Sequence, residues 1–352
     1  MMMQQTDMIT RLTLALGPDY RLMPLYAPEQ PVFLAVAWPL AEHVTGRKPR
    51  LPAGRGLSVR QAMLSAGAEA LELRASLAQS HRAALAEGPR EGGLAVVFCT
   101  DLASGRQVPV TAQQVFLDCA ETLGESLMED ANSTGCAVAP TREAALEVAL
   151  WECLERDALA LWWHGGRQAG HLPVEVIDGQ QPRLGWWLEQ RARRTRLLDL
   201  TTDCGLAVVA AVSCDAEGGR IAMGSAARPH RADAALAAVT ELVQTEVSLE
   251  QARAAGDPEA AEWEARGRIT LPAFVAGPLR EAPEALTCAA LVARLDALGH
   301  RVLACEMTLP GDPMPSLRVL VPGLCAMGGR IGTERFRRLC PDAAGPCLPE
   351  PY

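Results

Sequence analysis

The sequence from Thr141 to Trp163 reads T-R-E-A-A-L-E-V-A-L-W-E-C-L-E-R-D-A-L-A-L-W-W. Ala, Leu and Trp occupy nearly every side of a helix through this stretch, which is typical of a buried helix. Glu152 and Glu155 are three residues apart and therefore share one helical face. Buried carboxylates are costly unless a cation or several donors compensate their charge. The stretch therefore predicts either a structural ion pair with an arginine or a bound metal ion.

Two other predicted helices, from Ser58 to about Arg82 and from Ala232 to Ala255, carry the same spacing of residues. In each helix, alanines stand seven and three residues before a glutamate, and Glu or Gln stands three residues after it. These positions share one face, so another backbone or a ligand can approach the alanines while the acidic groups project together. The members are Ala62, Ala66, Glu69 and Glu72; Ala145, Ala149, Glu152 and Glu155; and Ala234, Ala238, Glu241 and Gln244.

Convergence of the three helices would bring up to five carboxylates together. Their mutual repulsion would raise their pKa values unless cations neutralise them. Oxygen ligands favour Mg²⁺ or Ca²⁺ over zinc, and Mg²⁺ held by few carboxylates usually completes its shell with water and phosphate oxygens. The pattern therefore predicts a nucleoside triphosphate site. The P-loop pattern G-x-x-x-x-G-K-[ST] does not occur, so metal and carboxylates would hold the nucleotide.

Composition limits the class of protein. The chain has 352 residues, 49% of them hydrophobic, and can bury a sizeable core. A net charge of −9 argues against a nucleic-acid partner. Eleven cysteines are scattered without a C-x-x-C pair, which argues against a zinc site. The sequence contains neither a secretory signal nor a stretch that would span a membrane, so we expect a cytoplasmic protein.

Helical patterns alternate with short apolar runs, which predicts an α/β or α+β fold with mixed sheets. The predicted strands include Pro31–Pro39, Leu94–Cys99 and Leu206–Cys214, the last of them central in its sheet. Small-residue turns are expected at Pro52–Gly56 and Gly224–Pro229. The arginine clusters Arg191–Arg196 and Arg335–Arg338 are interpreted as solvated helix faces or a docking patch. The loop histidines, His164, His171 and His230, are expected to be exposed.

Several motifs occur in a fixed order over about residues 30–325: G-R-G-L-S-x(6)-S-A-x-x-E-A-x-E (Gly54–Glu72), S-T-G-C-A (Ser133–Ala137), E-C-L-E-R-D-A (Glu152–Ala158), T-E-L-V-Q (Thr240–Gln244) and V-P-G-L (Val321–Leu324). Together they resemble the YcaO family. The resemblance implies an ATP- and Mg²⁺-dependent enzyme that activates a peptide backbone amide. It also implies a YcaO-like fold with the three glutamate-bearing helices as pseudo-repeats around the Mg²⁺–ATP site.

The resemblance also assigns roles to single residues. Arg55 stands where the family often has lysine, and the two cations are not equivalent. The chain departs from the family pattern at Leu73, Pro140 and Ala144, positions that help to hold the nucleotide. The implied metal ligands are Glu69, Glu72, Glu152 and Glu155; the implied nucleotide contacts are Arg55, Ser58, Ser65 and Arg156; and the implied catalytic residues are Arg156, Glu241 and Gln244.

For function, the resemblance implies a cyclodehydratase that forms thiazoline or oxazoline rings from Cys, Ser or Thr of a ribosomally made precursor peptide. The alternatives are a thioamide-forming enzyme that works with a TfuA-like protein, and a weakly catalytic nucleotide-binding scaffold. We expect one catalytic domain over residues 1–352, with an N-terminal segment (1–30) and a proline-containing tail (339–352). Because only about fifty residues precede the G-R-G motif, we expect a separate leader-binding partner, E1-like or TfuA-like, and allow for a homodimer.

Overall fold

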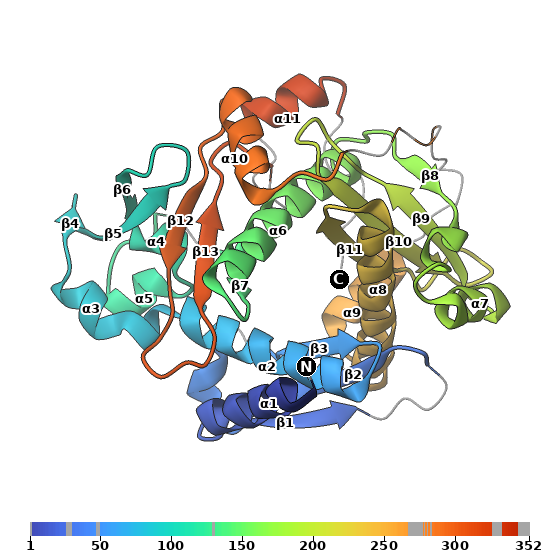
Figure 1. Cartoon of the computed structure of the whole chain (residues 1–352), viewed down its shortest axis with the longest axis horizontal. Coiled ribbons are helices and arrows are strands. Elements are labelled where there is room, and N and C mark those ends of the chain that lie inside the picture. Colours follow the sequence, from blue (N-terminus) through green and yellow to red (C-terminus); the bar gives the residue numbers. More distant parts are fainter. Residues whose placement is uncertain are drawn as a thin grey trace. The chain divides into compact units, whose positions relative to one another are not determined.

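A computed structural model of the chain describes residues 2–25, 30–46, 50–128, 131–266, 277, 279, 281, 284–325 and 333–343. The chain forms two compact units, whose elements are labelled in Figure 1. Unit 1 consists of Met1–Leu150 with Arg301–Pro322, and unit 2 of Trp151–His300 with Gly323–Tyr352. The helix α6 (Arg142–Trp163) begins in unit 1 and ends in unit 2. It confirms the helix expected from the sequence, which is buried from Cys153 to Trp163 apart from Arg156. The single catalytic domain over residues 1–352 stays a prediction.

Besides the start of α6, unit 1 contains five helices, two short 3₁₀ helices and nine strands among its described residues. The helices are α1 (Met2–Leu16), α2 (Val59–Ser76), α3 (Arg82–Glu87), α4 (Ala112–Val115) and α5 (Cys119–Leu123), and the 3₁₀ helices cover Glu42–Thr45 and Ala78–His81. The strands are β1 (Tyr20–Leu25), β2 (Phe33–Pro39), β3 (Ala53–Gly56), β4 (Arg90–Glu91), β5 (Leu94–Asp101), β6 (Gln107–Thr111), β7 (Cys136–Val138), β12 (Leu303–Glu306) and β13 (Ser316–Leu320).

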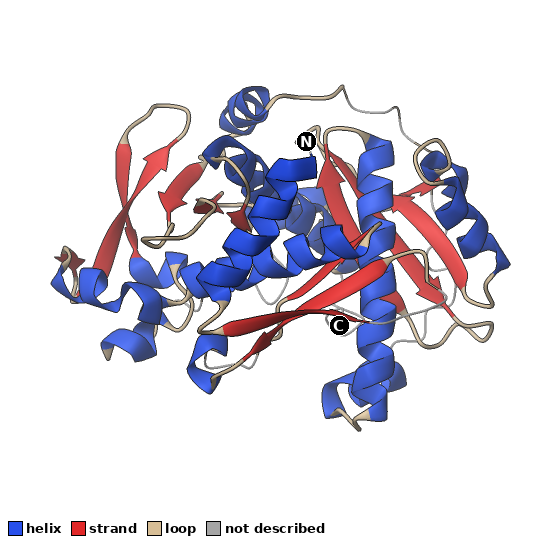
Figure 2. Cartoon of the chain, turned by 60° about the horizontal axis from the view of Figure 1, so that its bottom comes forward, coloured by secondary structure: helices blue, strands red, loops and turns tan. Residues whose placement is uncertain are grey.

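A three-stranded sheet of order β1-β2-β3 forms the first part of unit 1, and α2 packs on it (Figure 2). The expected turn at Pro52–Gly56 is wrong, because Ala53–Gly56 pairs with β2 as a strand. The glycine there serves close packing: a Cβ on Gly54 would lie 2.1 Å from the backbone nitrogen of Ala66. The strand therefore lies directly against the alanine face of α2.

The second sheet of unit 1 has the order β4-β5-β12-β13-β7, with β6 paired to β5. Its core includes Cys99, Cys136 and Cys305 beside Val110 and Phe116. The ten cysteines described in the chain are free thiols, and nine of them are buried, as expected for small apolar residues in a core. Cys347 and the tail motif P-C-L-P-E-P-Y lie outside the described residues.

Unit 2 is built around a four-stranded sheet of order β11-β10-β9-β8. Its strands are β8 (Gly170–Leu172), β9 (Arg194–Asp199), β10 (Ala207–Cys214) and β11 (Ala222–Arg228). Its helices are α7 (Pro182–Gln190), α8 (Arg231–Ala254), α9 (Pro258–Arg266), α10 (Cys288–Ala297) and α11 (Glu334–Leu339). A 3₁₀ helix covers Val174–Ile177. Every residue of β10 is buried, which confirms a central strand. In Figure 1, α8 runs alongside β10 and β11.

The expected turn at Gly224–Pro229 is also wrong, because residues 224–228 belong to β11. As in β3, the glycine permits close packing: a Cβ on Gly224 would lie 2.4 Å from the carbonyl oxygen of Ala238 and 2.2 Å from the nitrogen of Leu242. Gly224 therefore brings the edge of this sheet against the alanine face of α8.

The fold class of helices with several sheets is confirmed, whereas the pairings between the named strands are all antiparallel rather than mixed. Short connections such as the one between β10 and β11 join antiparallel neighbours without a crossover. The helix expected from Ser58 to Arg82 ends at Ser76, because Leu77 takes an extended conformation.

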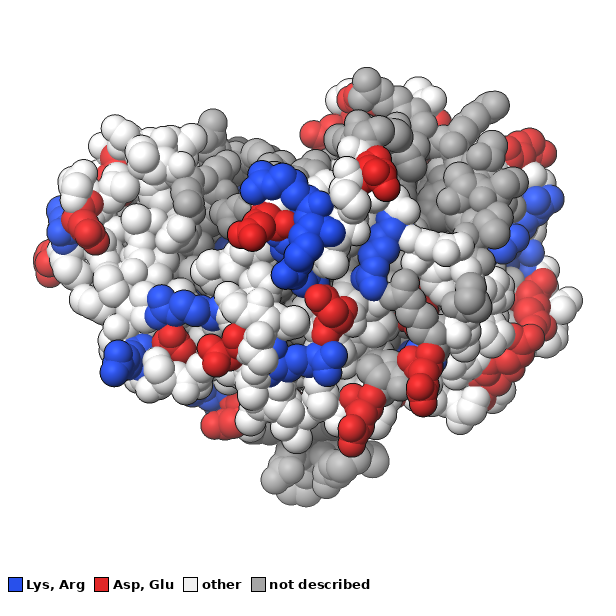
Figure 3. Space-filling view, turned by 90° about the horizontal axis from the view of Figure 1, so that it is seen from above, with Lys and Arg blue, Asp and Glu red and all other residues white. Residues whose placement is uncertain are grey.

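Charge on the surface is mixed in sign. Figure 3 shows Lys and Arg side chains interspersed with Asp and Glu on one face. Across the described parts of the chain, no helix is sufficiently long and apolar to span a lipid bilayer.

Candidate functional site

In unit 1 the predicted site residues lie on β3 and α2. Arg55 is half-buried on β3, and Ser65 and Glu72 are half-buried on α2, whereas Glu69 is exposed. Ser58 caps α2: its hydroxyl oxygen accepts a hydrogen bond from the Gln61 nitrogen at 3.2 Å. This bond confirms the predicted helix start and leaves the Ser58 hydroxyl hydrogen available for a further acceptor.

The alanines that precede the glutamates are fully buried in all three helices: Ala62, Ala66, Ala145, Ala149, Ala234 and Ala238. On α2 and α8 their neighbour is a strand glycine, Gly54 in β3 and Gly224 in β11. The small residues of these two helices thus admit another backbone. An arrangement of the three helices as pseudo-repeats around one site stays a prediction.

In unit 2 a buried carboxylate of α6 is held by the edge strand β11. Glu155 is 8% exposed. Its Oε1 accepts a hydrogen bond from the Ser225 hydroxyl at 2.6 Å, and its Oε2 accepts one from the Ala227 nitrogen at 3.2 Å. The Ser225 nitrogen donates to Oε2 of Glu241 on α8 at 3.3 Å. Because β11 is an edge strand, the N–H groups of every second residue point away from the sheet. The N–H groups of Ser225 and Ala227 do so, and they donate to the carboxylates of Glu241 and Glu155.

This arrangement shifts the pKa of Glu155. Burial raises the pKa of Glu155, and the nearby negative charge of Glu241 raises it further. Arg156, the Ser225 hydroxyl and Arg228 act in the opposite direction. A cation bound at Glu155 would offset both its burial and the repulsion from Glu241.

Arg156 follows Glu155 on α6 and faces the same charges. Its Nη2 lies 3.6 Å from Oε1 of Glu152. Burial works against its charge, but Glu152, Glu155 and Glu241 together raise the pKa of Arg156. The Nε atom of Arg156 is buried without a hydrogen-bond partner, so this guanidinium has a donor left for a ligand. Gln244 lies half-buried one turn beyond Glu241 on α8.

These residues fit the chemistry of Mg²⁺ and a phosphate group. Carboxylate oxygens are the ligands that Mg²⁺ prefers, and a guanidinium with an unused donor suits phosphate oxygens. Within the described ranges, however, no group of three or more His, Cys, Asp or Glu side chains is arranged to hold a metal. Glu69 and Glu72 belong to unit 1, while Glu152 and Glu155 belong to unit 2, so the four-carboxylate set stays a prediction.

Sequence reasoning missed the partners of the motif residues. Ser225 and Ala227 lie about seventy residues after Glu155, in a stretch interpreted as a turn. The run A-M-G-S-A-A contains no charged residue and no proline, which is compatible with a buried strand, and a strand there would have placed residues 225 and 227 on one edge. Arg228, whose guanidinium carbon lies 5.5 Å from the centre of the Trp151 ring, was also missed.

The last acidic residue of the E-C-L-E-R-D-A motif has a structural partner. Asp157 is fully buried and bonds Arg335 of α11: Nε donates to Oδ1 at 2.9 Å and Nη2 to Oδ2 at 2.9 Å. The same guanidinium donates to Asp203 at 2.6 and 3.2 Å. The expectation of a solvated face for Arg335–Arg338 is therefore wrong for Arg335 and holds for Arg337 and Arg338, which are exposed.

Two further expectations about polar residues need correction. Arg191 and Arg193 are not solvated, because both pair with the buried Glu246 of α8, at 2.7 and 3.1 Å. His164 is 3% exposed, since it continues the buried end of α6. His171 and His230 are exposed as expected.

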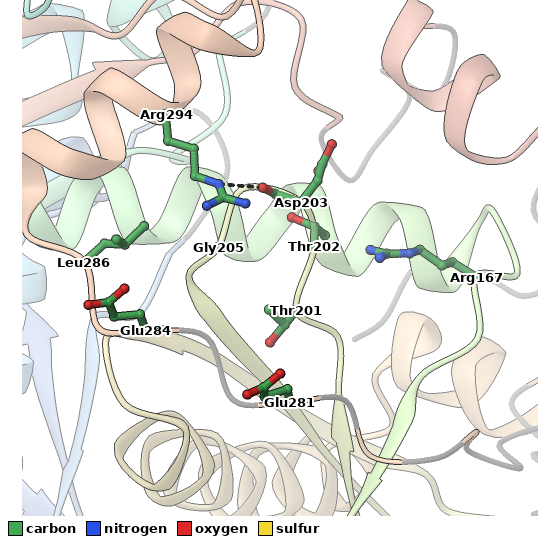
Figure 4. A pocket seen from close by; sticks show the side chains of 9 residues that line it. All are labelled: Arg167, Thr201, Thr202, Asp203, Gly205, Glu281, Glu284, Leu286 and Arg294. Atoms are coloured by element: carbon green, nitrogen blue, oxygen red, sulfur yellow. Dashed lines mark hydrogen bonds between the residues drawn. The ribbon is translucent and has the colours of Figure 1, made fainter.

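Unit 2 also has an open cavity of about 450 Å³ (Figure 4). Charged groups of both signs line it, with Arg294 donating from Nε to the Asp203 carbonyl oxygen at 2.8 Å. The lining residues are Arg167, Thr201, Thr202, Asp203, Gly205, Glu281, Glu284, Leu286 and Arg294. None of the predicted site residues belongs to this set.

Known structures share this fold. A heterocyclase in complex with substrate and cofactor aligns with a TM-score of 0.76 at 19% identity, over 93% of this chain and 54% of its own. This chain thus spans about half the length of that protein. YcaO from Methanopyrus kandleri, bound with AMPPCP and Mg²⁺, aligns with a TM-score of 0.70 at 21% identity, over 92% of this chain and 91% of its own. A chain of the E. coli microcin synthetase McbBCD complex aligns with a TM-score of 0.63 at 14% identity, over 86% of this chain and 87% of its own.

Sequence comparison gives the family. No curated protein sequence matches the chain. The model of the YcaO family, described as a cyclodehydratase that binds ATP and Mg²⁺, matches residues 88–325, about two thirds of the chain. This range includes the E-C-L-E-R-D-A helix, the strand β11 and the T-E-L-V-Q segment of α8. The chain therefore belongs to the YcaO family of ATP- and Mg²⁺-binding cyclodehydratases.

Proposed function

We propose that the protein uses ATP and Mg²⁺ to activate a backbone amide of a ribosomally made precursor peptide, and that a Cys, Ser or Thr side chain closes onto this amide as an azoline ring. The observation that carries the proposal is the Glu155–Ser225–Glu241 arrangement beside Arg156, in a chain of this family. It combines a carboxylate ligand for a metal, Glu155, with a guanidinium for phosphate, Arg156.

Each residue has a defined task in this proposal. ATP, when bound, would supply the phosphoryl group that turns the amide oxygen into a leaving group, and phosphate and ADP would be released as the ring forms. Glu152 and Glu155 hold Mg²⁺, together with Glu69 and Glu72 of α2 as the sequence predicts. Arg156 binds phosphate oxygens, and its carboxylate neighbours keep it charged.

The remaining predicted residues act around this centre. Arg55, Ser58 and Ser65 contact the nucleotide, and Glu241 and Gln244 act at the reacting amide. A hydrogen bond from the Ser225 nitrogen of β11 to the Glu241 carboxylate supports a fixed orientation of this side chain. The cavity in Figure 4 is assigned no part in the reaction.

Mass spectrometry of a Cys-containing precursor peptide after incubation with the protein, its partner protein and MgATP tests the product. Loss of one water per ring, with ATP turnover that the peptide stimulates, supports azoline formation. Exchange of oxygen for sulfur in the presence of a sulfur donor would instead identify a thioamide synthetase. Nucleotide binding with an unchanged peptide would indicate a scaffold.

Substitution of Glu152 tests the metal assignment separately. Glu152→Gln keeps the size of the side chain and removes its charge, so Mg²⁺-dependent binding of AMPPCP and peptide modification should both fall at least tenfold, as expected for loss of a charged ligand. Glu143→Gln is the matched control, because Glu143 is exposed in the first turn of the same helix. Unchanged modification by Glu152→Gln would show that the metal assignment is wrong.

We also propose a separate protein that binds the leader part of the precursor peptide. The McbBCD complex, a structural neighbour, is a multi-protein synthetase by its description, which supports such an assembly. Co-purification with the products of neighbouring genes tests for the partner, and light scattering of the purified chain tests the homodimer. Peptide modification by the isolated chain at full rate would refute the need for a partner.

A further inference from the structure

Glu155 and Glu241 come from different helices, α6 and α8, and β11 lies against both. Ser225 of this strand donates hydrogen bonds to both carboxylates: its hydroxyl to Glu155 at 2.6 Å and its nitrogen to Glu241 at 3.3 Å. The hydroxyl bond decides the rotation of the Glu155 carboxylate, while Ala227 holds the second oxygen.

From this geometry we infer that Ser225 is a positioning residue, which sets the orientation of the Glu155 carboxylate relative to Glu241 for binding of Mg²⁺ and nucleotide. The inference rests on the proposed ATP and Mg²⁺ site and adds a residue outside the motifs that suggested it. Both bonds to Glu155 come from neutral donors, so they fix its direction without neutralising its charge. The carboxylate therefore keeps its attraction for a cation.

A second serine in the same sheet provides a contrast. Ser213 of β10 is also buried and donates its hydroxyl to a glutamate of α8, Glu246. There, Arg191 and Arg193 pair with the carboxylate at 2.7 and 3.1 Å, which compensates its charge within the protein. A buried serine thus donates to a carboxylate that arginines bond directly at Ser213, and to one whose hydrogen bonds come from neutral donors at Ser225.

Gly224 contributes to the same hydrogen-bonded arrangement. Because a Cβ at this position would meet the α8 backbone at 2.2–2.4 Å, only glycine lets β11 approach α8 closely enough for the next N–H group to reach Glu241. The bond from the Ser225 nitrogen therefore depends on its neighbour, whereas the bond from its hydroxyl can be removed alone by substitution.

The test is the Mg²⁺ concentration that gives half-maximal binding of AMPPCP, measured by calorimetry for the wild type, Ser225→Ala, Ser225→Thr and Ser213→Ala. A hydrogen bond to a charged group typically contributes about tenfold or more to an equilibrium constant. Ser225→Ala should therefore raise this midpoint about tenfold, and Ser225→Thr, which keeps the hydroxyl, should restore it to within about threefold. Ser213→Ala should lower the melting temperature and leave the midpoint unchanged.

Two further variants distinguish a wrong role for Ser225 from a wrong metal site. Ser225→Cys replaces the hydroxyl with a larger, weakly donating thiol, so a shifted midpoint there does not come from a cavity, and its melting temperature shows whether the variant is folded. Glu155→Gln reports on the site itself. A wild-type midpoint for Ser225→Ala and Ser225→Cys, with a shifted one for Glu155→Gln, overturns the role of Ser225 alone. A wild-type midpoint for Glu155→Gln overturns the proposed metal site and this inference with it.

Discussion

Removal of the Arg335 side chain should destabilise unit 2 strongly. The exposure of its side chain is 1%, and that of its partner Asp157 is 0%. Three nitrogen–oxygen distances of 2.9–3.0 Å join the two groups, and Asp203 accepts two more bonds. Burial opposes the charge of Arg335, but its hydrogen bonds to Asp203 and Asp157 raise its pKa far above the ordinary arginine value.

The magnitude follows from the charge that Arg335→Met would leave behind. Asp157 would keep one hydrogen bond, from the Cys325 nitrogen at 2.9 Å, and lose its cation. Breaking a buried pair by removing one partner costs about 3–5 kcal/mol. For a unit of about 180 residues, each kcal/mol shifts the melting temperature by about 2–4 °C. We therefore expect a decrease of about 6–20 °C.

Differential scanning calorimetry of three variants checks this expectation. Arg337→Met is the control, because Arg337 is exposed on the same helix and its loss should change stability by no more than about 0.5 kcal/mol. Asp157→Asn combined with Arg335→Met removes both charges and should regain at least about half of the lost stability. A loss below about 1 kcal/mol for Arg335→Met, or a double variant no more stable than the single one, would refute the reasoning.

Three further predictions concern unit 1. Gly54→Ala should cost about 3 kcal/mol or more in urea unfolding, because its Cβ would lie 2.1 Å from the Ala66 nitrogen. Gly179→Ala in unit 2, where a Cβ would meet open space, is the control and should have little effect, and equal midpoints for the two variants would contradict the packing argument. Ser58→Ala should cost about 1 kcal/mol and speed amide exchange at Gln61, and unchanged exchange would contradict the cap. Burial lowers the pKa of His81 below its ordinary 6.5. Because the unfolded chain then binds more protons, the stability that His81 contributes is present above pH 6.5 and is lost as pH falls through the lowered pKa. The difference in unfolding free energy between the wild type and His81→Gln should therefore vary between pH 5 and 7, and a constant difference would contradict it.

The local features of the chain could be predicted from its sequence. Apolar and acidic residues at helical spacing predict the helices α2, α6 and α8, and an unbroken apolar run predicts the strand β10. Such periodicity depends on residues within a few turns of one another, so it is present before any tertiary contact forms. The ordered motifs also predicted the family that the match over residues 88–325 confirms.

Only the tertiary structure determined which residues each of these elements contacts. Gly54 and Gly224 belong to strands rather than turns, because the glycines are needed for contact with a helix backbone and not for a tight bend. Glycine-rich stretches predict both structures equally well, and only the position of the helix distinguishes them. The partners of Glu155 and Asp157 are likewise about seventy and 178 residues away in the sequence. Spacing along a chain places two glutamates on one face of a helix, but whether a serine, an arginine or a metal compensates them depends on chain segments that folding brings together.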